Sequence, residues 1–245
     1  MTLLETRGLV CGYGARAVVD AGSLRLAAGE SVSIIGLNGA GKSTVLRTIC
    51  GQLPPLAGEA LVSGRSVAAL APRERARAIA FLPQHAEIDL GLSVEELVRL
   101  GRTPYLGRFG HLGREDARQV ENAMDLCRVR ELMGARLGEL SGGERQRARL
   151  AMVIAQEAPV VLLDEPTSHL DVVQRFALHG VLAEMRGRRG TAFVIVSHAI
   201  ADAERFGDSV ILIESGKACH LGPSKRGSAR AALIAAADIP EEWVY

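Results

Sequence analysis

The chemistry of this sequence begins with a glycine-rich loop, GLNGAGKST, at residues 36–44. Its spacing is G-x-x-x-x-G-K-[ST], in which glycines let backbone N–H groups turn inward around a polyphosphate. Lys42 supplies a compact charge for the β- and γ-phosphates, and the Ser43 hydroxyl can ligate Mg²⁺. An apolar strand precedes the loop and a helix follows, whose positive N-terminus adds to the site. We expect a nucleotide to be held by Gly36, Asn38, Gly39, Ala40, Gly41, Lys42, Ser43 and Thr44.

A second set of reactive side chains ends the run VVLLDEP, residues 160–166. Its four apolar residues are typical of a short strand buried in a parallel sheet. Ligands bind at the carboxyl ends of such strands, where Asp164 and Glu165 lie. We expect Asp164 to hold Mg²⁺ through water, and Glu165 to orient or deprotonate an attacking water. An apolar strand that ends in two acids is a weak signal alone, and the phosphate loop makes it a strong one.

The stretch LSGGERQRARL, residues 140–150, carries another candidate anion site. Ser141 and Glu144 have the spacing of a capping box, which alone is a structural motif. Capping does not explain Gly142 and Gly143, which remove side chains where the backbone could approach another group. A helix N-terminus with a serine hydroxyl is also a phosphate site. Since this helix lies far along the chain from the phosphate loop, we expect it to serve the nucleotide of a second, head-to-tail copy.

The elements that must position these residues alternate between strands and helices, which indicates an α/β fold with a mostly parallel sheet. Short strands are expected over residues 3–35, including a buried one at 31–36, and another strand at 78–82. A helix is expected over 44–53, stopped by the Pro-Pro pair that follows it. The run SVILIESGKACHLG predicts a hairpin that turns at Ser215-Gly216.

Residues 85–140 differ in character and are expected to form a helical insertion. Ser93 and Glu96 have capping-box spacing at the start of one helix. A second helix is predicted from apolar residues at helical intervals, namely Ala117, Val120, Ala123, Met124 and Cys127.

Composition limits the classes of function. The 245 residues are 48% hydrophobic with a formal charge of +1, which favours a folded domain and disfavours a general nucleic-acid binder. The four cysteines are scattered, as expected of reduced thiols and unlike a disulfide framework or zinc site. The N-terminus lacks a signal-peptide core, and no uncharged run approaches the ~18 residues of a membrane span. We therefore expect a cytosolic protein whose membrane role would need a partner.

Taken together, LSGGERQR and VVLLDEPTSHLD resemble the signature of ABC-type ATPases, and the resemblance covers residues 3–223. It implies a P-loop NTPase with a RecA-like, mostly parallel sheet, an N-terminal antiparallel β subdomain and an inserted helical subdomain. It also implies ATP and Mg²⁺ as cofactors. Tyr13 would stack on adenine, and Gln84 would sense Mg²⁺ and the attacking water. His198 would contact the γ-phosphate, and Asp171 would be the acid of a loop that crosses a dimer interface.

The resemblance assigns hydrolysis to Lys42, Gln84, Glu165 and His198. Three positions are unusual for the family, without removing a group that hydrolysis needs: Glu144, where glutamine is more common, Ala199, where many members have aspartate, and His169, at a variable position of the interface loop. The chain would be a single ABC ATPase domain with a nucleotide-binding core at 1–84 and 141–223, the insertion at 85–140, and a C-terminal tail at 224–245.

The segments LAPRERARAIAFLPQ and LSVEELVRLGRTPYLGRFG look like those of ATPase subunits of metal-chelate importers, which move iron–siderophores, haem or cobalamin. This resemblance implies a second, identical ATPase subunit, a transmembrane permease that contacts the insertion, and indirectly an extracytoplasmic substrate-binding protein. The protein would then lie peripherally on the cytoplasmic face of the membrane, with no nucleic-acid partner. Two alternatives remain open: a soluble repair or assembly ATPase, and the ATPase subunit of an exporter.

Overall fold

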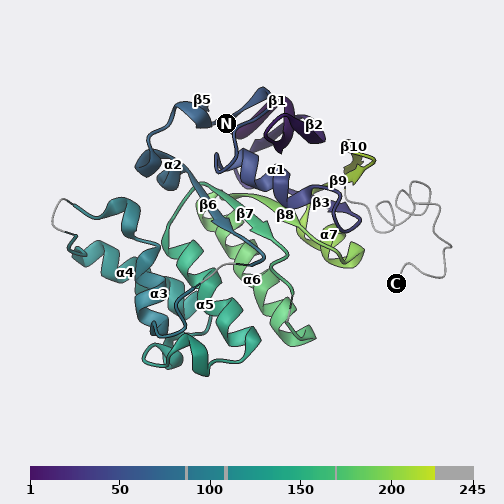
Figure 1. The fold of residues 1–245 in the computed structure, drawn as a ribbon. Coiled ribbons are helices and arrows are strands. Elements are labelled where there is room, and N and C mark those ends of the chain that lie inside the picture. Colours follow the sequence, from purple (N-terminus) through teal and green to yellow (C-terminus); the bar gives the residue numbers. More distant parts are fainter. Residues whose placement is uncertain (86–87, 108–109, 169, 224–245) are drawn as a thin grey trace.

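The computed structural model describes residues 1–85, 88–107, 110–168 and 170–223, and the strands in these ranges form one ten-stranded sheet. The strand order is β5-β4-β1-β2-β10-β9-β3-β8-β7-β6 (Figure 1). Neighbours are parallel from β9 to β6, and this half comprises β9 (Ser209–Glu214), β3 (Ser31–Gly36), β8 (Ala192–Val196), β7 (Val160–Asp164) and β6 (Ile79–Leu82). The other half comprises β1 (Thr2–Tyr13), β2 (Arg16–Ala27), β4 (Ala57–Val62), β5 (Arg65–Ser66) and β10 (Lys217–Pro223).

The parallel half has continuous apolar strands because helices cover both of its faces. Every residue of β7 and of β8 is buried, as expected for central strands of a parallel sheet. Because these strands run the same way, their carboxyl ends meet at one edge of the sheet. Gly36, Leu82, Asp164 and Val196 end their strands there, so the segments that follow them are brought together.

The helices lie on both sides of the parallel strands, with α1 on one side and α5 and α6 on the other (Figure 1). None of the helices in the described part of the chain is long and apolar enough to cross a membrane. The α-helices are α1 (Lys42–Ile49), α2 (Pro72–Ala78), α3 (Val94–Leu100), α4 (Arg114–Leu126), α5 (Gly142–Ala155), α6 (Val172–Arg189) and α7 (Ile200–Phe206). Short 3₁₀ turns are η1 (Val67–Ala69), η2 (Thr103–Tyr105), η3 (Arg130–Leu132) and η4 (Leu137–Glu139).

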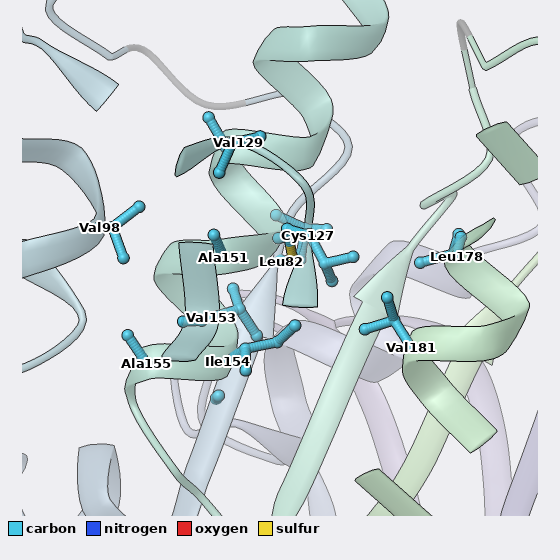
Figure 2. Packing of buried hydrophobic residues seen from close by; sticks show 14 of the residues in the cluster. Leu82, Val98, Cys127, Val129, Ala151, Val153, Ile154, Ala155, Leu178 and Val181 are labelled. Carbon is cyan, nitrogen blue, oxygen red and sulfur yellow. The ribbon is translucent and has the colours of Figure 1, made fainter. Parts of the chain in front are cut away.

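Helix α5 lies at the centre of the larger hydrophobic core. Its residues Ala151 and Ile154 pack among side chains from β6, α3, the end of α4 and α6, as Figure 2 shows. The same core reaches the sheet through Leu82, Leu163 and Ile195. Helix α5 is therefore packed against both the helices of residues 85–140 and the sheet that carries the strand ends.

Most predicted elements are confirmed, with boundary shifts. The helix expected at 44–53 spans 42–49, and the N-terminal strands β1 and β2 are long, at 12 residues each, where short strands were expected. The predicted face of α4 is buried except at Ala117, which is exposed because it lies in the first turn, beyond the core. The predicted hairpin of β9 and β10 does turn at Ser215-Gly216, where both residues have positive φ.

Candidate functional site

The glycine-rich loop connects β3 to α1, as its sequence predicts. Gly41 has a φ of 97°, and a Cβ there would lie 2.3 Å from Val19 Cγ2, so only glycine fits. Lys42 is buried, and its Nζ donates to the Gly36 and Leu37 carbonyls at 2.8 and 2.9 Å. Burial lowers the pKa of Lys42, although the nearby carboxylates of Glu165 and Asp164 oppose this shift. The ammonium therefore lies inside the loop, bonded to two of its carbonyls.

Asp164 ends β7 beside the loop and is 2% exposed. Its Oδ1 is buried and has no hydrogen-bond partner among the described residues, which is an unusual state for a polar atom. Burial raises the pKa of the Asp164 carboxyl, while a hydrogen bond from Ser43 acts in the opposite direction. An orphaned carboxylate oxygen next to a serine hydroxyl is a donor set that suits a hard cation such as Mg²⁺.

Glu165, Gln84 and His198 meet at the edge formed by the ends of β7, β6 and β8. The chain leaves β7 with Glu165 at a φ of 52°, a left-handed conformation that is uncommon outside glycine and typical of functional sites. Gln84 Nε2 donates to Glu165 Oε2 at 2.6 Å, and His198 Nε2 bonds Glu165 Oε1. The Glu165 side chain is 12% exposed and that of His198 42%. A carboxylate held between two polar side chains at a sheet edge can accept a proton from a water placed there.

These groups line one cavity of about 460 Å³ together with the loop. Tyr13 is half-exposed at the rim, and its hydroxyl lies 3.4 Å from Thr44 Oγ1. The structure therefore brings most of the predicted site together, since the lining includes Tyr13, Asn38, Gly39, Gly41, Lys42, Ser43, Thr44, Gln84, Glu165 and His198. Among the described residues, that lining does not include Gly36 and Ala40 of the loop or Asp164 at the end of β7, nor does it include Ser141, Gly142, Gly143 or Asp171.

Ser141 is the N-cap of α5, and the capping box predicted from its sequence is present. Its hydroxyl and backbone N–H both donate to Glu144, at 2.6 and 2.9 Å, and it accepts from the Glu144 N–H at 3.3 Å. These hydrogen bonds lower the pKa of the exposed Glu144 carboxyl. A Cβ on Gly143 would lie 2.3 Å from Oε1 of Gln174, which is the end of a flexible side chain, so an added methyl group would displace Gln174.

Asp171 is the N-cap of α6, and its Oδ1 accepts from the Gln174 N–H at 2.7 Å. Through Gln174, the start of α6 touches the start of α5. His169, in the same loop, and the tail at 224–245 lie outside the described residues.

Two polar residues of α5 that contact this site are not identified by the sequence motifs. Gln146 Nε2 donates to the Pro166 carbonyl at 3.2 Å, and Arg149 Nη1 donates to Gln146 Oε1 at 3.0 Å and to the Gln84 carbonyl at 3.3 Å. Gln146 belongs to the LSGGERQR stretch and Arg149 follows it, but their residue types do not indicate these contacts, because arginine and glutamine on a helix are mostly exposed.

The sequence model of the ABC transporter family matches residues 19–168. The hemin import ATP-binding protein HmuV of Streptomyces coelicolor is 40% identical over 98% of this chain and 85% of its own. The ferric enterobactin transport ATP-binding protein FepC of Escherichia coli is 36% identical over 91% of this chain and 82% of its own. The dimeric structure of the bacterial ABC transporter cassette MJ0796 superposes with a TM-score of 0.79, at 26% identity, over 88% and 96% of the two chains. This chain therefore belongs to the ABC transporter family, as one of its ATP-binding, ATP-hydrolysing members.

Proposed function

We propose that this chain is the ATPase subunit of an importer for a metal chelate of the iron–siderophore, haem or cobalamin class. The observation that carries the ATPase mechanism is the meeting of Gln84, Glu165 and His198 in the cavity of the phosphate loop. The import of a metal chelate is supported by the relatives, which are import or transport ATP-binding proteins for hemin and ferric enterobactin.

In this proposal, backbone N–H groups of residues 36–44 and the Lys42 ammonium bind the ATP phosphates, and Tyr13 stacks on adenine. Ser43 would ligate Mg²⁺, and Asp164 would hold it through water with the oxygen that has no other partner in the described structure. Bound Mg²⁺ would neutralise charge on the β- and γ-phosphates during transfer to water. Lys42 can reach the phosphates by exchanging one of its two carbonyl contacts.

Hydrolysis follows from the three side chains at the strand ends. Glu165 orients the attacking water and accepts its proton, Gln84 holds the water and monitors Mg²⁺, and His198 donates to the γ-phosphate. Because Gln84 and His198 both bond Glu165 directly, ATP and water must replace these contacts before the reaction. The rate would therefore depend on how the segments that carry these side chains are placed.

Two copies would complete each nucleotide site, with Ser141, Gly142 and Gly143 of one copy facing the phosphates held by the other. Asp171 would lie in the loop that crosses between them. The dimeric relative supports this arrangement. To donate to a phosphate, the Ser141 hydroxyl proton would turn away from Glu144, while the two backbone hydrogen bonds of the capping box could remain.

The insertion, residues 85–140, would bind a permease, and closure of the dimer would move the insertion and so change the conformation of the permease. The core would then consist of 1–84 and 141–223, with a tail at 224–245. The protein would lie on the cytoplasmic face of the membrane through this contact, and a substrate-binding protein would deliver the chelate to the permease from the other side.

A pull-down from detergent-solubilised native membranes tests the import proposal. The bait is tagged Glu165→Gln protein, with and without ATP, and the control bait is Lys42→Ala. The expected result is recovery of a polytopic permease that, when purified in complex with the parental ATPase, carries a metal chelate inward in proteoliposomes on ATP addition. A permease that moves its substrate outward would favour the exporter alternative, and recovery of soluble proteins or nucleic acid alone would favour the soluble machine.

A further inference from the structure

Arg149 lies on α5 and donates to the backbone immediately before and at Gln84. Its Nη2 donates to the Pro83 carbonyl, and its Nη1 donates to the Gln84 carbonyl at 3.3 Å. These two carbonyls follow β6, at the sheet edge where the Gln84 side chain reaches Glu165. The planar guanidinium suits this task, because its fixed fork can bond two neighbouring acceptors at once.

The charge of Arg149 is not paired with a carboxylate within the described residues. The side chain is partly buried, its Nε is buried without a hydrogen-bond partner there, and burial lowers the pKa of the guanidinium. Arg102, near the opposite end of α5, is a useful contrast, since it donates to the Ala155 carbonyl and pairs with Asp116 and Glu157. Burying a cation without a partner of opposite charge disfavours folding, so stability alone is a poor explanation for Arg149.

A second contact extends from Arg149 to the strand end that carries Glu165. Arg149 Nη1 donates to Gln146 Oε1 at 3.0 Å, and Gln146 Nε2 donates to the Pro166 carbonyl at 3.2 Å. Pro166 follows Glu165 directly. Arg149 and Gln146 of α5 thus bond the backbone next to Gln84 and next to Glu165, the two residues whose side chains form a hydrogen bond with each other.

We propose that Arg149 is a positioning residue for ATP hydrolysis, which sets the backbone of Gln84 directly and that of Glu165 through Gln146. Since α5 begins at Ser141, the same helix links the contact with the second copy to the placement of the attacking water. This inference rests on the proposed roles of Gln84 and Glu165. It adds that hydrolysis, but not ATP affinity, depends on a residue that touches neither ATP nor water.

The test compares Arg149→Met and Arg149→Lys with the control Arg102→Met in the purified ATPase subunit. For each variant, kcat and KM for ATP, the ATP dissociation constant and the melting temperature are measured. Because Arg149→Met should displace the Gln84 and Glu165 side chains, we expect it to lower kcat roughly 10- to 100-fold. The ATP dissociation constant should stay within about twofold of the parental value. Arg149→Lys keeps the charge but not the fork, so it remains folded and recovers only part of kcat. Arg102→Met lowers the melting temperature and leaves kcat unchanged.

A double-mutant cycle distinguishes the positioning role of Arg149 from the proposed role of Gln84 in hydrolysis. If Arg149 acts through Gln84, then Arg149→Met lowers kcat much less in a Gln84→Ala background than in the parent. Folded Arg149→Met and Arg149→Lys proteins with parental kcat, or with additive losses in the cycle, would overturn the inference. If Gln84→Ala alone leaves kcat unchanged, the proposed role of Gln84 fails instead.

Discussion

Replacing Glu165 by glutamine should stop turnover without harming the site. The amide has the volume of the carboxylate and can keep both observed contacts, because its oxygen accepts from Gln84 Nε2 and its N–H₂ donates to His198 Nε2. The fold and the phosphate loop should therefore be unaffected. What is lost is the ability to take a proton from water.

General base catalysis contributes about 10²- to 10⁴-fold to a rate, which corresponds to about 3–5 kcal/mol of transition-state stabilisation. We expect Glu165→Gln to lower kcat by this factor, with an unchanged ATP dissociation constant and melting temperature. Phosphate release, equilibrium nucleotide binding and thermal unfolding measure the three quantities. The matched control is Glu59→Gln, the same chemical change on β4 at a side chain that is 41% exposed, which should retain the parental kcat. Hydrolysis by Glu165→Gln at the parental rate would refute the role given to Glu165.

Three further changes test other parts of the site. Asp164→Asn should stabilise the nucleotide-free protein by about 1–3 kcal/mol, since it removes a buried charge with an unpartnered oxygen. Because the pKa of Asp164 is raised, the parent loses stability as pH rises through that value, so the gain in melting temperature should vanish at acidic pH; an equal gain at every pH would contradict this. Gly41→Ala should weaken ATP binding at least about tenfold, because the methyl meets β2 and φ is positive, whereas Gly187→Ala, in open space on α6, should not; equal affinities would show that the loop adapts. Glu144→Gln should tighten the ATP-dependent dimer roughly two- to fivefold by removing a carboxylate beside the Ser141 anion site, and a weaker dimer in sedimentation would contradict that site.

The parts of the site that depend on local sequence could be predicted. The loop at 36–44 is recognisable because its glycine spacing predicts a phosphate-binding turn. The acids that end β7 are recognisable because the continuous apolar run before them predicts a buried strand. Gln84 and His198 had no chemical signal of their own and were assigned only through the order of motifs. Their contact with Glu165 depends on the sheet order, in which β6, β7 and β8 are neighbours although they are far apart in sequence.

The contacts between helices could not be predicted in the same way. The sequence of α5 suggests a basic surface helix, and only its packed position turns Arg149 toward the Gln84 segment. Likewise, the position of the Gln174 side chain next to Gly143 could not be predicted from the sequence. Side-chain contacts between distant elements leave no periodic pattern in a sequence.

In the proposed mechanism, a second copy completes each nucleotide site through Ser141. Its most direct test is the mass by light scattering, with ATP and Mg²⁺, of Glu165→Gln protein and of the same protein carrying Ser141→Arg, alongside the ATP affinity of each. We expect a dimer for the first protein and a monomer for the second, with equal ATP affinity. Loss of ATP binding by the monomeric Ser141→Arg protein, or an ATP-dependent dimer that survives the arginine, would contradict it.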